Sequence, residues 1–319
     1  MNRTDWCTIS GEVTVAETRL LTREALLELL RADSTAPLVN RLRQNPTYHG
    51  LGGHEDPENL SSRIESAVVE ALKELANESP QSAPVELLLS AYDHQQVRNF
   101  VKARVHKHDF EPTMLSDLAE DQLQLAWDDL VDASPQWAGL CRTVRAELTA
   151  GGDPNTVIDL IIDRVELSAL LALARTTDCE LIEQCYSDYA VLRARLALVR
   201  ARLAQIDPEQ LRRLASGLLP DDELTELIDL APDRLIAKLT PGHAQEDDTE
   251  RLTHFAVDID NRMTACVREA RGIVFGPERV FAYAWGLAME CLDLKLISET
   301  KLLGAPSEMT EWRLRNTYV

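Results

Sequence analysis

Aromatic residues and long apolar runs are both scarce in this chain, and each shortage narrows what the protein can be. Aromatics make up 5% of the 319 residues, so the apolar volume must come mainly from leucine, alanine, valine and isoleucine, a composition that suits helices. No stretch reaches the roughly 18 apolar residues of a membrane-spanning helix. The opening MNRTDWCTISGEV lacks the apolar core of a signal peptide. We therefore expect a soluble, globular and helical protein.

Basic residues are outnumbered by acids. The chain has 33 lysines and arginines against 53 aspartates and glutamates, which gives a net charge of −20. Nucleic-acid binding needs a basic footprint, and direct adsorption to an anionic membrane needs one as well. The charge therefore argues against nucleic acid and against an anionic membrane surface as direct partners. It permits a basic protein partner, and it is equally compatible with solubility alone.

Cysteines are few and form no CxxC pair, so no zinc site is expected. Several of them stand in apolar helical stretches, where a free cysteine behaves as a small hydrophobic residue. We interpret them as unpaired thiols in a reducing compartment. The six are Cys7, Cys141, Cys179, Cys185, Cys266 and Cys291.

Catalytic signatures are absent as well. The chain contains no GxSxG, P-loop, GxGxxG or HExxH sequence, and nothing pairs a nucleophile with a base. His106 and His108 diverge by about 200° on a helix, so we interpret them as cations at a helix C-terminus. No catalytic, cofactor or metal site is predicted.

One acidic motif offers an enzymatic alternative. Residues 128–132 read Asp-Asp-Leu-Val-Asp, which matches the magnesium-binding DDxxD motif of all-α prenyl diphosphate enzymes. Carboxylates along one helical flank could hold Mg²⁺ against a diphosphate. However, the second metal motif of those enzymes is not visible, and the aromatic walls that a carbocation needs are sparse. A solvated acidic helix end is the favoured interpretation.

What the chain does contain is one helical signature in three copies: an acid, three residues, an apolar residue and then a base. The copies are Asp93 with Val97-Arg98, Asp188 with Leu192-Arg193, and Glu290 with Leu294-Lys295. Upstream of each lies a pair of leucines twelve residues apart across an expected helix-turn-helix: Leu30/Leu42, Leu118/Leu130 and Leu227/Leu239. The offsets from first leucine to acid are 63, 70 and 63 residues.

This near-constant offset indicates three copies of one helical unit. We predict an all-α protein whose units span 1–109, 110–205 and 206–319, sharing or exchanging helices, with pseudo-threefold symmetry. Within a copy the acid and base lie about 140° apart on the helix, so they cannot pair with each other. Our hypothesis is that the acid of one unit meets a basic group of another; the alternative is surface charge beside a buried stripe.

Apolar periodicity predicts the long helices. They are expected over 60–76, 85–105, 137–149, 179–203 and 249–271, and from Pro277 to just before Gly304. Thr22 is a plausible N-cap for the first short helix. Residues 11–15 are expected to be extended and residues 307–319 to form a tail helix. Loops are expected at 45–59 and 241–248.

The C-terminal region resembles the C-type subunit of prokaryotic V-type ATPases, the counterpart of the d-type subunit in the eukaryotic enzyme. That family is typified by a Gly-Pro-Glu helix start, the acid with its apolar-basic pair, Lys-Leu-x-Gly, a proline and an Arg-x-x-Tyr-Val terminus. The matching residues here are Gly276-Pro277-Glu278, Glu290 with Leu294-Lys295, Lys301-Leu302-Leu303-Gly304, Pro306, and Arg315 to Tyr318-Val319. The chain departs from the family at Arg195, where the sister copies carry Phe100 and Ile297.

The resemblance implies a function without chemistry. The family forms a funnel-like helical collar on the cytoplasmic face of the membrane, between the proteolipid rotor ring and the D and F subunits of the central shaft. It transmits torque between ATP hydrolysis or synthesis and the transport of H⁺ or Na⁺, an ion that is chosen in the ring. It touches the membrane only through the ring. A generic helical scaffold for an unrelated partner is the further alternative.

Overall fold

All regular elements in the described part of the chain are helical, apart from an isolated bridge between Ser216 and Leu219. The computed structural model describes residues 3–49, 59–112, 115–240 and 247–319. The all-α prediction is therefore confirmed, whereas most of the two predicted loops, 50–58 and 241–246, lies outside the described residues. Among the helices that are described, none combines the length and the apolar character needed to cross a bilayer.

The chain divides into two compact units, each built from segments far apart in sequence. Unit 1 comprises residues 1–89, 174–185 and 257–319, and unit 2 comprises 90–173 and 186–256. The predicted borders at 109/110 and 205/206 both fall inside unit 2. Compact packing therefore does not follow the repeat, and the division into 1–109, 110–205 and 206–319 stays a prediction.

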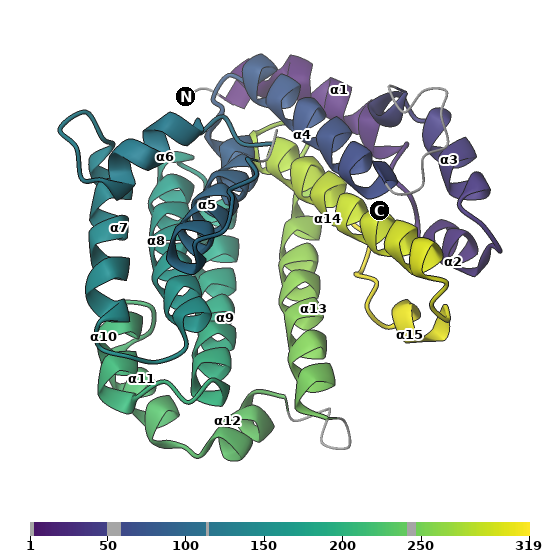
Figure 1. Cartoon of the computed structure of the whole chain (residues 1–319). Coiled ribbons are helices and arrows are strands. Elements are labelled where there is room, and N and C mark those ends of the chain that lie inside the picture. The colour runs from purple at the N-terminus through teal and green to yellow at the C-terminus, as the bar shows by residue number, and fades with distance from the viewer. Residues whose placement is uncertain (1–2, 50–58, 113–114, 241–246) are drawn as a thin grey trace. The chain divides into compact units, whose positions relative to one another are not determined.

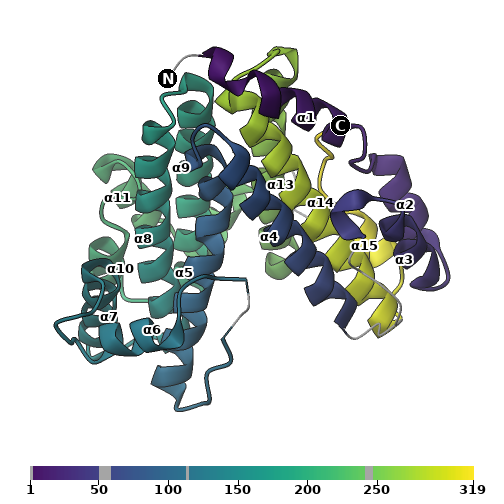
Figure 2. The same cartoon turned by 90° about the horizontal axis from the view of Figure 1, so that it is seen from above.

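Unit 1 is built around its last long helix, α14 (Pro277–Leu303). In both views α14 lies beside α4 (Figures 1 and 2), and it also packs against α1 and α2. The other elements that lie wholly in this unit are η1 (Arg3–Trp6), α1 (Cys7–Glu17), α2 (Arg23–Arg31), α3 (Ala36–Arg43), η2 (Pro46–Tyr48), α4 (Leu60–Glu78), η4 (Arg268–Gly272) and α15 (Glu308–Glu311).

Two neighbouring apolar stripes explain why α14 is mostly buried. Val280, Leu287 and Leu294 belong to one stripe and Phe281 and Trp285 to the other, and all five are buried. The helix begins with proline at its first position, where the missing N–H is not needed. It ends at Gly304 in the left-handed conformation, which glycine adopts without a Cβ penalty.

Unit 2 is a bundle in which α5, α8 and α9 run alongside one another (Figures 1 and 2). Its core is aliphatic, with Val97, Ile161 and Leu198 among the buried residues. The elements that contribute to it are α5 (Ala83–His106), α6 (Glu120–Trp127), α7 (Pro135–Leu148), α8 (Pro154–Thr176), α9 (Glu180–Leu203), α10 (Pro208–Ala215), α11 (Asp221–Asp229), α12 (Pro232–Leu239) and α13 (Asp248–Val267). The borders between the units fall inside α5, α8, α9 and α13.

The predicted long helices are confirmed to within a few residues, and Thr22 caps α2 by accepting a hydrogen bond from the Ala25 amide. Two local predictions are wrong. Residues 11–15 lie in helix α1 instead of an extended segment, because Trp6, Ile9 and Val13 recur at helical spacing and are buried together. The tail helix shrinks to α15, since the residues after it bind to unit 1 through their backbone groups.

The second leucine pair does not span a helix-turn-helix. Leu118 and Leu130 flank the single helix α6, and Leu130 is 51% exposed. By contrast, Leu30 and Leu42 are buried on α2 and α3. The hairpin part of the repeat is therefore lost in the middle copy.

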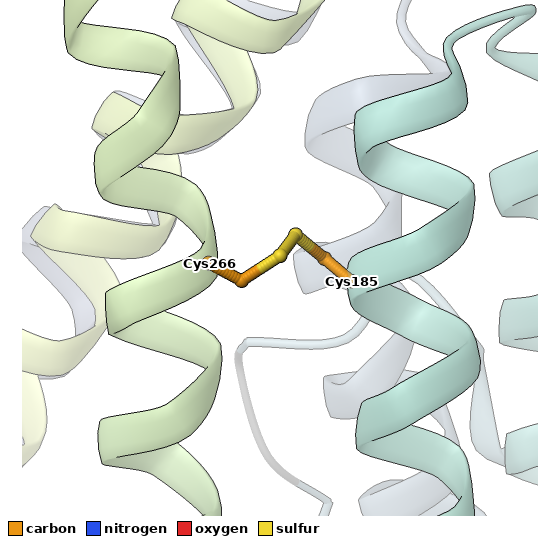
Figure 3. Close-up of a disulfide and its surroundings, with 2 residues drawn as sticks. All are labelled: Cys185 and Cys266. Carbon is orange, nitrogen blue, oxygen red and sulfur yellow. A yellow bond between two sulfur atoms is a disulfide. The ribbon is translucent and has the colours of Figure 1, made fainter.

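The cysteine interpretation needs a correction. Cys185 on α9 and Cys266 on α13 form a disulfide with their Cα atoms 6.0 Å apart, and their side chains point toward one another (Figure 3). These residues are separated by 81 positions, and spacing alone does not reveal a pairing that helix packing creates. Cys7, Cys141, Cys179 and Cys291 are free, as predicted.

Candidate functional site: the repeated signature and the C-terminal motif

The base of the first copy lies against an acidic stripe on α8. Arg98 on α5 is 2.7 Å from Asp163 and 3.5 Å from both Asp159 and Glu166. The three acids are spaced i, i+4 and i+7, so they share one helical face. Because Arg98 and Asp163 are both mostly buried, this contact is shielded from solvent more than a surface ion pair would be.

The same stripe also interacts with the second copy. Burial raises the pKa of Glu166, and electrostatic interactions with His94, Arg193 and Arg98 oppose that shift. Lys102 adds an ion pair of 2.7 Å with Asp159. Bases from two copies of the signature, Arg98 on α5 and Arg193 on α9, therefore stabilise the ionised form of one α8 carboxylate.

The acid of the first copy fixes the chain that leads into α6. Asp93 accepts a hydrogen bond of 2.5 Å from the Ser116 hydroxyl. Ser116 in turn accepts one of 3.1 Å from the Leu118 amide, while the Gln96 side chain donates to the Leu118 carbonyl. Asp93 thus positions a connecting segment.

The second copy differs from the other two, as expected from Arg195. The guanidinium of Arg195 forms an ion pair of 2.7 Å with Glu223 on α11, whereas its counterparts Phe100 and Ile297 are fully buried. Asp188 is exposed, and Arg193 lies over the ring of Tyr189 at 5.8 Å from its centroid. An ion pair replaces apolar packing at this position of the repeat.

The third copy has the most deeply buried acid. Glu290 on α14 is 5% exposed and accepts hydrogen bonds from the Leu21 amide at 2.5 Å and the Tyr48 hydroxyl at 2.9 Å. Burial raises its pKa to about 7, although these two hydrogen bonds oppose the shift. Glu290 therefore joins α14 to both the α1–α2 connection and η2.

Lys295, the base of this copy, lies toward α4. Its ammonium is 2.6 Å from Glu65, and both side chains are largely buried. One turn further along, Ser61 of α4 donates to Glu299 at 3.0 Å. Polar contacts thus reinforce the apolar packing between α14 and α4.

The C-terminal motif binds into unit 1 rather than standing free. The Arg315 amide donates to Asp293 at 3.1 Å, and its guanidinium lies 2.8 Å from Asp260. Burial raises the pKa of Asp293 to about 6, against the effect of Arg315. Asp293 thus holds the tail against α14.

Tyr318 completes this attachment. Its hydroxyl donates to Glu17 at 2.8 Å, and Glu17 also forms an ion pair with Arg279. The Tyr318 side chain packs on Gly286, where an added Cβ would lie only 2.8 Å from the tyrosine Cβ. A helical glycine is therefore needed so that the tail can approach α14 closely.

The Gly-Pro-Glu sequence forms the start of α14. Gly276 has φ 152°, a conformation that favours glycine, and a Cβ there would collide with the Glu278 carboxylate. Pro277 occupies the first helical position. Glu278 forms an ion pair with Arg3 of η1. The motif thus sets the geometry of a helix start and ties it to the N-terminal region.

The predicted residues do not converge on one chemical centre. The first and second copies lie in unit 2, and the third copy and the C-terminal motif lie in unit 1. The bases of the first and third copies pair with acids of neighbouring helices. The hypothesis that each acid meets a base of another unit stays a prediction.

The acidic motif at 128–132 does not lie along the side of a helix, because α6 ends at Trp127. Asp128 is the C-cap of α6, and Asp129 has a left-handed backbone and forms an ion pair with Arg142. Across the residues that the structure describes, no three His, Cys, Asp or Glu side chains are grouped so that they could hold a metal ion. These carboxylates end a helix.

The sequence analysis did not identify most of the residues that contact the repeated signature and the C-terminal motif. They are Tyr48, Glu65, Asp163, Glu17, Asp260 and Asp293. One signal was available, because Asp159, Asp163 and Glu166 form an acidic stripe in a largely apolar helix. The others carry no local mark, since each is defined by a contact between distant segments.

No curated protein matches the chain. A family model described as ATP synthase (C/AC39) subunit matches residues 9–313, which include all three signatures and the start of α14. The prediction from the C-terminal motif is confirmed: the chain belongs to the C/AC39 family of V-type ATP synthase subunits.

Proposed function

We propose that this protein is a non-catalytic central-stalk subunit that links the membrane rotor ring to the central shaft of a V-type ATPase. The observation that carries the proposal is the family match over residues 9–313. Members of such a family are structural subunits of an ATP-driven machine. The subunit would transmit torque between ATP hydrolysis or synthesis and proton or sodium transport.

The bracing of the long helices supports this role. Helix α14 has 27 residues and so spans about 40 Å at ~1.5 Å per residue. It is joined to α4 by Lys295 and to the tail by Asp293. In unit 2, α5 is joined to α8 through Arg98. A subunit that transmits torque must resist shear between its helices, and side-chain bonds between neighbouring helices provide that resistance.

The proposed partners are the proteolipid subunits of the ring and the D and F subunits of the shaft. We place the protein on the cytoplasmic face, touching the membrane only through the ring, as a three-lobed collar with pseudo-threefold symmetry. Its net charge of −20 suits basic groups on a partner. In this proposal the signature residues and the C-terminal motif fix how the repeated helical units join.

A prenyl diphosphate enzyme is not favoured. Its proposed metal motif, residues 128–132, lies beyond the end of α6, with Asp129 engaged by Arg142. A generic scaffold for another partner remains the competing explanation for an all-α chain without paired catalytic groups. Capture of the protein's partners from cells separates this explanation from a rotary subunit.

The test is capture of the tagged full-length chain from its own cells after gentle detergent solubilisation, followed by quantitative mass spectrometry. We expect ring proteolipids and both shaft subunits to be enriched together. Recovery of other proteins without ring or shaft subunits would overturn the proposal in favour of a scaffold. Release of diphosphate from a prenyl diphosphate, lost on Asp128→Ala, would overturn it in favour of the enzyme.

A charge swap tests the torque role within the assembled complex. Lys295→Glu places two acids together between α14 and α4, and Lys295→Glu with Glu65→Lys restores an opposite-charge pair. We expect the single variant to assemble but to pump fewer ions per ATP hydrolysed, and the double variant to recover. Unchanged coupling in the single variant would contradict a role for this brace.

A further inference from the structure

The disulfide occupies a particular place in the chain. Cys185 lies near the start of α9 and Cys266 near the end of α13, and both belong to unit 1. Residues 186–256, the second segment of unit 2, run between them. The bond therefore ties the helix by which the chain leaves unit 1 to the helix by which it returns (Figure 3).

The other cysteines are poorly suited to exchange with this bond. Burial raises the pKa of Cys141 and of Cys179 to about 11 and that of Cys291 to about 12. Because only the thiolate attacks a disulfide, thiols with such values are inert at neutral pH. Cys179 is the nearest of them in sequence to the bond, yet it is unpaired.

Free thiols accompany this single bond, and Cys7 is both free and exposed. Exposed unpaired thiols are typical of proteins held in a reducing compartment, where a disulfide is usually transient, catalytic or redox-sensing. The two residues also differ in exposure, because Cys185 is 1% exposed and Cys266 is only half-buried. Of the two, Cys266 is therefore the residue nearer to solvent.

We propose that Cys185 and Cys266 form a reversible thiol–disulfide switch whose exchange partner is a small-molecule thiol. In the reducing direction a thiolate attacks the Cys266 sulfur, the S–S bond breaks, and Cys185 leaves as a thiolate that takes up a proton. A second thiolate then attacks the mixed disulfide at the small molecule's sulfur and releases Cys266. Two small thiols become one small disulfide, and the reverse sequence re-forms the bond.

The switch changes how firmly two helices are held in unit 1. In the oxidised form residues 180–185 and 257–267 are joined covalently. In the reduced form they depend on noncovalent packing, so local opening requires no bond to break. Both states can be prepared in the isolated chain, so this test does not depend on the proposed rotary function.

The full-length chain should be equilibrated across a series of ratios of reduced to oxidised glutathione, quenched with acid and alkylated, and each cysteine quantified by peptide mass spectrometry. We expect Cys185 and Cys266 to pass together from dithiol to disulfide within the series. A bond that persists at every ratio is a permanent cross-link and overturns the proposal. A bond that does not form at the most oxidising ratio overturns it as well.

Hydrogen exchange of the two states supplies the structural readout. We expect amides in 180–185 and 257–267 to exchange at least about tenfold faster in the reduced chain. Cys266→Ser should exchange like the reduced chain in both buffers, and Cys179→Ser should respond like the wild type. Equal exchange in the two states, or loss of the response in Cys179→Ser, would contradict the assignment.

Discussion

The first and third copies of the signature share a charge pattern but not an environment. In unit 2, Asp93 is half-buried and accepts one hydroxyl, while Arg98 faces three acids. In unit 1, Glu290 is almost fully buried with two donors, while Lys295 meets one acid. Burying a carboxylate is costly unless its hydrogen bonds are made. The same motif position therefore contributes differently to the free energy of unfolding in the two units.

The acids provide the largest expected contrast. Glu290→Ala should lower the free energy of unfolding by about 4 kcal/mol at pH 6, because it leaves the buried Leu21 amide and Tyr48 hydroxyl unpaired, at about 1–3 kcal/mol each. Asp93→Ala should cost less than about 1 kcal/mol, since its partner lies in a partly solvated connection. Urea unfolding measures both. Equal losses in the two variants would show that the copies are energetically equivalent.

The dependence of stability on pH provides a second test of the buried acid in the third copy. The pKa of Glu290 is raised from its ordinary 4.5 to about 7, so between these values the folded state binds a proton that the unfolded state lacks. Stability is therefore greatest below about pH 4.5 for this group and falls as the pH rises to 7, by roughly 3 kcal/mol. Asp293, raised to about 6, acts in the same direction.

Glu290→Gln should remove the larger part of this slope. Thermal unfolding followed between pH 5 and pH 8 provides the measurement. We expect Glu290→Gln to flatten most of the curve, with the contribution of Asp293 remaining. A wild-type curve that rises through this interval would contradict the assignment of the shift to Glu290.

Two helical glycines extend the contrast to packing. Gly286→Ala in unit 1 should cost about 2 kcal/mol, because its Cβ would overlap Tyr318 at 2.8–3.0 Å. Gly139→Ala in unit 2 should stabilise by about 0.5–1 kcal/mol, since nothing lies within 4 Å of the added Cβ. Chemical unfolding of both variants gives the values. A stabilised Gly286→Ala would mean that the tail does not pack against α14.

Replacing the bases should give the smallest difference in stability between the two copies. Here the first copy, in unit 2, should lose more than the third copy, in unit 1. Arg98→Ala leaves three half-buried carboxylates of α8 with less compensating charge, so we expect a loss of about 1.5 kcal/mol. Lys295→Ala leaves only Glu65, and about 0.5–1 kcal/mol is expected. Unfolding at low and high salt measures both. A larger loss in Lys295→Ala would reverse our ranking of the two networks.

The helices could be predicted because their evidence is local. In α14 the apolar residues recur at helical spacing between a proline and a glycine, and the structure follows that pattern. The prediction of an extended segment at residues 11–15 was wrong. Valine and threonine favour strands when considered one by one, whereas Trp6, Ile9 and Val13 together favour a buried helical face. In this segment the burial of apolar side chains outweighs the strand propensity of the individual residues.

The polar partners could not be predicted, because sequence separation conceals them. Arg98 and Asp163 are 65 residues apart, Tyr318 and Glu17 are 301 apart, and the disulfide joins residues 81 apart. Charged residues are too common, at 27% of the chain, for any one pair to be singled out. Only the packing of the helices selects which of them meet.

By itself, the sequence determined the helical class, the long helices, the repeated signature and the family, because each depends on patterns within a few turns of helix. The tertiary structure alone decided that Glu290 would be buried with a pKa near neutrality, that Arg98 would face the acids of α8, and that Cys185 would meet Cys266. A helix face can be read from spacing, but the solvation of a charge depends on everything that surrounds it.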